Sequence, residues 1–157
     1  MARSSRTGVL FMQSQSFFGA DTFVHSLLMR ELDRDRFDVH VACTTAGDGG
    51  ASSVLNRLRL IPNLTVHPVN FGPTLFGRSR TELPRAATGA ASAALGLSGL
   101  AVYLKRNNIR IVHGTEKPRD ALYGVALARL TGARSVVHMH VMYHDQLSGK
   151  VRWALRN

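Results

Sequence analysis

The sequence contains a single cysteine, Cys43, among its 157 residues. One thiol excludes an intramolecular disulfide framework and a zinc site built from several cysteines, and it is typical of proteins from a reducing compartment. Cys43 ends an apolar stretch, so we expect it to be a small core residue.

Long hydrophobic runs are also missing. The apolar run at 9–12 is shorter than the roughly 7–15 residues of a signal-peptide core. The uncharged stretch 86–104 approaches the length of a membrane span, but it is rich in Ala and Gly. We therefore expect a buried or membrane-surface helix at 86–104 rather than a spanning one.

Acidic residues are few: ten Asp and Glu stand against twenty Lys and Arg, which gives a formal net charge of +10. This balance favours anionic partners such as phosphorylated substrates or an anionic membrane, although a generally basic surface would have the same composition. The bases are scattered singly, apart from a flexible basic N-terminus at 1–7. Because no dense basic run is present, we expect no nucleic-acid partner.

Apolar runs suited to buried strands alternate with helical patterns along the chain. The expected strands are 8–12, 37–43, 64–69, 109–113 and 135–140. The expected helices are 23–32, 52–60, 85–106, 118–130 and one that begins near Gln146. This alternation predicts one α/β domain over 8–157, a Rossmann-like parallel sheet with helices on both faces.

Three details of this pattern can be checked individually. The first helix should turn one apolar face to the sheet, formed by Phe23, Val24, Leu27, Leu28 and Leu32. Pro68 places the third strand at or near an edge of the sheet, because proline cannot donate a ladder hydrogen bond. Pro118 fits the first turn of the fourth helix.

Ligands of such sheets bind outside the carboxyl ends of the strands. This rule selects the loops 13–19, 44–50, 114–118 and 141–145. In the first loop, the amides around Ser16 and Gly19 could face an anion at a helix N-terminus. The three-glycine dinucleotide fingerprint is absent, which argues against a nicotinamide or flavin enzyme. Alternatively, Gly19 only lets strand and helix pack closely.

His138 and His140 lie two residues apart at the fifth strand, so both rings should point to the same face. With His144 they could bind a metal ion, but only Asp145 adds a further ligand with suitable spacing. We therefore favour no metal site and a single functional histidine, His140, with His138 as a deeper core residue. His25, His40 and His67 are given no role.

Thr115, Glu116 and Lys117 follow the fourth strand and open the next helix. The two charged side chains could hydrogen-bond a polyol or a phosphate. A solvated helix start, with Glu116 favoured by the helix dipole, explains them equally well.

Three segments together resemble the N-terminal, acceptor-side domain of family 4 glycosyltransferases of the GT-B fold, over residues 8–157. They are 9–12 with 18–21, 108–115, and 136–140. The sequence departs from the family pattern in its first loop, which has one glycine where two or three are common.

The resemblance implies sugar transfer, with retention of configuration, from a nucleotide-sugar donor to a glycan or lipid acceptor, without a metal ion or other cofactor. It implies that Gly19 and Ser16 lie near the donor phosphates or sugar and that His140, beside the sugar, is catalytic. It places Thr115, Glu116 and Lys117 on the acceptor side.

In the family, a C-terminal domain holds most of the donor, and none of its motifs occurs here. The sequence also ends inside an amphipathic helical pattern without a capping Gly or Pro, so we expect a domain truncated within its last helix and inactive without that partner half. The alternative is a non-catalytic α/β binding domain that acts with a separate partner chain. We expect a cytoplasmic location, with contact to the inner face of the cell membrane as a hypothesis.

Overall fold

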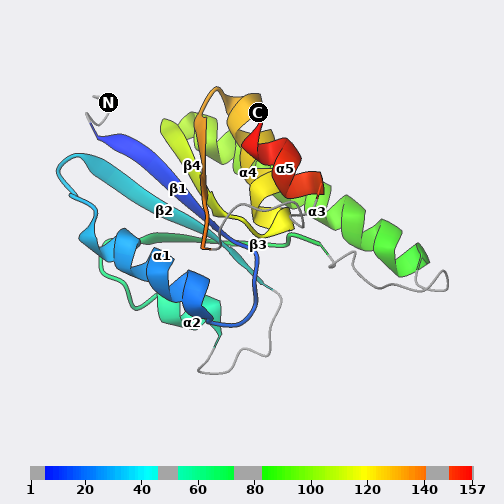
Figure 1. Cartoon of the computed structure of the whole chain (residues 1–157), viewed down its shortest axis with the longest axis horizontal. Coiled ribbons are helices and arrows are strands. Elements are labelled where there is room, and N and C mark those ends of the chain that lie inside the picture. Colours follow the sequence, from blue (N-terminus) through cyan, green and yellow to red (C-terminus); the bar gives the residue numbers. More distant parts are fainter. Residues whose placement is uncertain (1–5, 46–52, 73–82, 141–148, 157) are drawn as a thin grey trace.

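A computed structural model of the chain shows a parallel sheet flanked by helices (Figure 1). The structure describes residues 6–45, 53–72, 83–140 and 149–156, without the side chains of 83–88 and 150. His144, Asp145 and Gln146, together with most of the loop 44–50, lie outside the described residues.

Five parallel strands form the sheet, in the order β3-β2-β1-β4-β5. They are β1 (Thr7–Gln13), β2 (Phe37–Thr44), β3 (Thr65–Val69), β4 (Ile109–Thr115) and β5 (Arg134–His138). All five predicted strands are confirmed, with ends that shift by up to two residues. Pro68 lies on the edge strand β3, as predicted.

Helices cover both faces of the sheet, which confirms the predicted Rossmann-like α/β fold (Figure 1). They are α1 (Ala20–Glu31), α2 (Val54–Leu58), α3 (Leu83–Arg106), α4 (Pro118–Thr131) and α5 (Gly149–Leu155). The helices α1 and α2 lie on one face, and α3 and α4 lie on the other. α5 packs on α4 through Val151 and Ala154. Pro118 occupies the first turn of α4, as predicted.

The pleat of β1 divides the core into two layers. Val9 and Phe11 point to the α1 and α2 face, whereas Leu10 and Met12 point to α3 and α4. Cys43 is fully buried in the first layer, which confirms its predicted place in the core. Burial raises the pKa of its thiol to about 12, so the thiol stays protonated and unreactive at neutral pH.

The predicted inward face of α1 is largely wrong, although Leu32, just after the helix, packs against the core. The helix buries Thr22, His25, Ser26 and Met29. Three of the predicted residues are instead exposed: Phe23 by 53%, Leu27 by 41% and Leu28 by 38%. The reason is a polar partner on the sheet: the buried Gln13 accepts a hydrogen bond from Thr22 and contacts His25. A buried amide without partners would be costly, so it turns the polar side of the helix inward.

Two small residues of α3, Ala93 and Gly96, lie close to the backbone after β3. A Cβ at Gly96 would come within 3.1 Å of the carbonyl oxygen of Asn70. At Gly72, which has φ +75°, a Cβ would lie 2.8 Å from that of Ala93. The N-terminal part of α3 projects beyond the sheet (Figure 1). Among the described residues, no helix is long and apolar enough to cross a membrane.

Leu104 of α3 is fully buried between the sheet and α4, and it offers a test of this packing. We expect Leu104→Ala to lower the free energy of unfolding by about 2–5 kcal/mol, because it leaves a cavity. Leu95→Ala, on the exposed side of the same helix, should change it by less than about 0.5 kcal/mol. Urea denaturation measures both, and equal effects would contradict the observed helix orientation.

Candidate functional site

The carboxyl ends of β1, β4 and β5 meet at one edge of the sheet. The chain reverses its strand order between β1 and β4, where ligands of doubly wound sheets bind. The described parts of this edge are the loop 14–19, the residues 115–117 and the residues 139–140. Each follows the end of one of these strands.

Asp120, near the start of α4, ties two of these segments together. Its carboxylate is fully buried; Oδ1 accepts a hydrogen bond from the Ser14 amide and Oδ2 accepts one from the Thr115 hydroxyl, each at 3.1 Å. Burial raises the pKa of Asp120 to about 6, although these donors act in the opposite direction. The sequence analysis missed Asp120. No local pattern singled it out, because its partners Ser14 and Thr115 lie on other segments.

Arg119 holds the same loop from a second direction. Its guanidinium donates to the carbonyl oxygens of Ser14 and Gly72, the latter at 2.9 Å. It therefore links the loop after β1 to the segment after β3. Together, Arg119 and Asp120 engage both the carbonyl and the amide of Ser14.

A second link joins the start of α1 to the start of α4. Lys117 Nζ lies 3.1 Å from Asp21 Oδ2, and the Gln15 amide donates to the same oxygen at 3.1 Å. Burial acts to raise the pKa of Asp21, but Lys117 and Gln15 outweigh it and lower this pKa. Asp21 is therefore ionised and largely neutralised by Lys117.

Glu116 positions the segment that follows β5. Its amide donates to the His138 carbonyl at 3.1 Å, and its carboxylate accepts the amide proton of His140 at 3.2 Å. The backbone of His140 is thus held by a residue of the loop after β4.

Four histidines gather behind this edge, on the α1 face of the sheet. His25 of α1 lies between His113 of β4, at 4.8 Å between ring centroids, and His138 and His140, at 5.5 and 5.8 Å. His138 and His140 stack at 4.4 Å, which confirms that their rings share a face. His25 had been given no role, because its neighbours are close in space but distant in sequence.

The two deepest rings of this cluster are neutral at physiological pH. Burial, and then the neighbouring imidazoles, lower the pKa of His25 to about 3 and that of His113 to about 4. Nε2 of His25, Nδ1 of His113 and Nε2 of His140 are buried without a hydrogen-bond partner among the described residues. One ligand nitrogen from each of His25, His113 and His138 lies within 4.8 Å of the others.

The predicted site residues are placed as follows. His140, Glu116 and Lys117 lie together at the edge, and Ser16 is exposed in the loop after β1. Thr115 is fully buried, so its hydroxyl serves Asp120 and does not face the solvent. Gly19 caps α1 with extended backbone, and a Cβ there would meet the ring of the exposed Phe17 at 2.8 Å.

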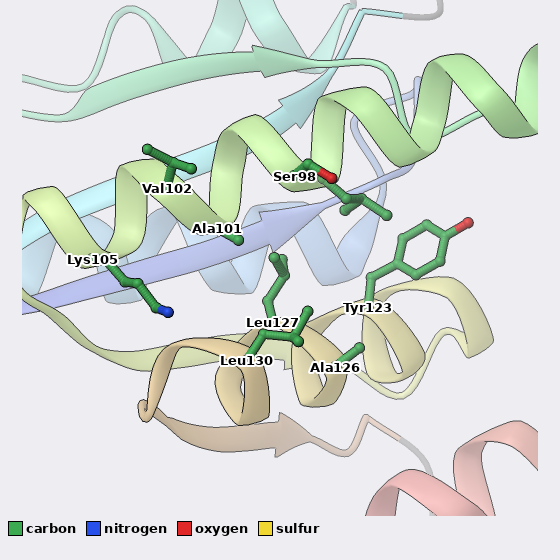
Figure 2. Close-up of a pocket in the computed structure, with 9 residues that line it drawn as sticks. Ser98, Ala101, Val102, Lys105, Tyr123, Ala126, Leu127 and Leu130 are labelled. Atoms are coloured by element: carbon green, nitrogen blue, oxygen red, sulfur yellow. The ribbon is translucent and has the colours of Figure 1, made fainter.

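A separate apolar groove lies between α3 and α4, with a volume of about 330 Å³. Figure 2 shows Val102 and Lys105 on the α3 side and Tyr123 and Leu130 on the α4 side. Val102 is 48% exposed and Leu130 is 68% exposed. The groove therefore presents aliphatic side chains to the outside, next to the basic end of α3.

Compared with known protein families, the chain matches the model described as a glycosyl transferase 4-like domain over residues 18–157. No curated protein matches it.

Asp120 gives a prediction on pH. When the pH rises above 3.8, the unfolded state releases the proton of Asp120 first, whereas the folded state keeps it to about pH 6. The carboxyl group therefore stabilises the fold most at low pH. Between pH 4 and 6, we expect the advantage of the wild type over Asp120→Asn to shrink by up to about 3 kcal/mol. Above pH 6 it should be constant.

Urea denaturation of both proteins at several pH values measures this difference. The histidines, whose pKa shifts have the opposite effect on stability, are common to both proteins and cancel. An advantage that grows with rising pH would mean that the two hydrogen bonds outweigh burial.

Proposed function

We propose, because the chain belongs to the family of glycosyl transferase 4-like domains, that it is the acceptor-side domain of a glycosyltransferase. The reaction is sugar transfer, with retention, from a nucleotide-sugar donor to a glycan or lipid acceptor. A donor-binding domain, on the same chain or on a separate one, completes the active site. The transfer step itself uses no cofactor.

The convergence at the β1–β4 switch point supports this function. His140, Glu116, Lys117 and Asp21 come from three different segments and lie at one edge, linked by the contacts described above. Such an edge offers charged groups that suit a polyol, beside the half-buried ring of His140. In this proposal His140 contacts the transferred sugar, and Glu116 and Lys117 line the acceptor side.

The start of α1 suits the donor phosphates. No side chain caps this helix, so its first backbone N–H groups are free to donate hydrogen bonds to an anion beside Gly19 and Ser16. The positive end of the helix dipole favours the same anion. Asp21 in the first turn would repel a phosphate, but Lys117 offsets its charge. The net charge of +10 adds long-range attraction for an anionic donor.

His140→Ala tests the catalytic assignment in the enzyme assembled with its donor-binding domain. We expect turnover to fall by about 100-fold or more, because the substituted side chain no longer contacts the charge that develops on the sugar. Steady-state kinetics measure turnover, and circular dichroism confirms the fold. His67→Ala, on the edge strand β3, is the matched control. Unchanged turnover in His140→Ala would remove His140 from the mechanism.

The groove between α3 and α4 supports a second part of the proposal, peripheral contact with an anionic membrane at its cytoplasmic face. Aliphatic side chains on this surface can enter the interfacial region, while Lys105 and Arg106 approach the headgroups. A lipid acceptor would be held at such a surface.

Vesicle co-sedimentation tests this contact. We expect Val102→Ser and Leu130→Ser each to weaken binding to phosphatidylglycerol vesicles by about tenfold, since each removes buried apolar area. Leu60→Ser, at a residue that is more exposed than either but lies in the turn after α2, should have no effect. Added salt should weaken binding of all proteins. Equal binding by Leu130→Ser and Leu60→Ser would exclude the groove as the contact.

A further inference from the structure

We propose that His25, His113 and His138 form a binding site for a divalent transition-metal ion, with Zn²⁺ as the best fit. The proposal does not depend on the proposed transfer function, although its ligand His138 stacks on the ring of His140 at 4.4 Å. Its ligands come from α1, β4 and β5, so only the folded chain brings them together.

The distances suit a small ion with nitrogen ligands. One ligand nitrogen from each histidine lies within 4.8 Å of the others. A tetrahedral Zn²⁺ with Zn–N bonds of about 2.0–2.1 Å places its ligand nitrogens about 3.4 Å apart. Rotations of the three rings that shorten the longest nitrogen–nitrogen distance by up to about 1.4 Å would complete this geometry.

Unpartnered ring nitrogens are the second observation. Nε2 of His25 and Nδ1 of His113 are buried without a hydrogen-bond partner among the described residues. A buried polar atom without a partner is costly, and in native proteins it calls for an explanation. A metal ion bound through Nε2 of His25 and Nδ1 of His113 would give both atoms a partner.

Gln13 can support such a site from behind. Its side-chain amide lies 2.6 Å from Nδ1 of His25, and its oxygen accepts from the Thr22 hydroxyl. If the amide turns by 180°, its oxygen accepts the Nδ1 proton of His25, and its nitrogen donates to Thr22. Nε2 of His25 is then free to bind a metal, with the carbonyl support that metal-binding histidines commonly have.

The ligand set selects the kind of ion. Three imidazoles without a carboxylate suit zinc and related metals and do not suit Mg²⁺ or Ca²⁺, which prefer oxygen. Within the described part of the chain, these three ligands leave one tetrahedral position open. One of the three ligands, His113, also lines a largely apolar groove of about 360 Å³ between α1 and the sheet.

The proposal departs from the sequence-based prediction of no metal site. The set considered there combined His138 with His140 and His144. Two of those residues are replaced by His25 and His113, which no spacing along the chain connects. Without a metal, the same rings would form only an aromatic cluster beside Phe11.

Isothermal titration of the chelator-treated 157-residue chain with ZnCl₂ tests the site. We expect one Zn²⁺ per chain, no binding of MgCl₂, and a Tm rise of about 5–10 °C at a hundredfold excess of zinc over Kd. His113→Ala and His138→Ala should each weaken zinc binding by at least the roughly 10–100-fold that loss of a supporting residue causes. His67→Ala, outside the cluster, should bind as the wild type does.

NMR of the histidine ring nitrogens in the wild-type chain gives a readout that needs no variant to fold. Zinc should shift the ring nitrogens of His25, His113 and His138, and leave those of His40 and His67 unchanged. Absence of stoichiometric zinc binding would overturn the proposal and leave the aromatic cluster. Undiminished binding by folded His113→Ala and His138→Ala, or shifts confined to other histidines, would overturn it as well.

Discussion

The arrangement of the candidate site depends on one buried carboxylate. Asp120 joins the loop after β1, through the Ser14 amide, to the end of β4, through the Thr115 hydroxyl. Without this common acceptor, the Ser14 amide and the Thr115 hydroxyl would be buried without a hydrogen-bond partner. The carboxylate also lies one residue after Arg119, which binds the carbonyl of the same Ser14. The start of α4 thus holds the loop that leads to α1. This attachment sets how far the candidate residues at the start of α1 lie from those at the start of α4.

The two faces of the sheet bury different kinds of side chain. Towards α3 and α4, β1 contributes Leu10 and Met12 to an apolar layer, where stabilisation comes from the area removed from water. Towards α1, the layer is apolar at Phe11 but becomes polar at Gln13, which is fully buried. This amide brings Thr22 and His25 inward and leaves apolar side chains of α1 exposed. The histidine cluster lies where these polar groups meet the ends of β4 and β5, so an unusual helix orientation and the candidate metal site have one cause.

The sequence correctly predicted the features that impose a regular pattern of apolar residues on a segment of the chain. All five strands, the edge position of Pro68 and the core position of Cys43 agree with the structure, because burial on a sheet imposes a local pattern on each segment. The same method was wrong for α1. There the apolar pattern indicated one face, but the hydrogen-bonding needs of Gln13, on a different element, decided which face is buried. Asp120 was missed for the same reason, since its partners Ser14 and Thr115 are on other segments.

The sequence by itself determined the α/β class, the order of elements and the edge of the sheet at which polar residues gather, including His140, Glu116 and Lys117. These properties follow from short-range patterns and from the rule that parallel strands place their carboxyl ends together. Only the tertiary structure decided which side chains meet there. It brought His25 to His113 and His138, gave Thr115 to Asp120, and paired Lys117 with Asp21. Such contacts depend on helix rotation and on the satisfaction of buried polar groups, which couple residues that no spacing along the chain relates.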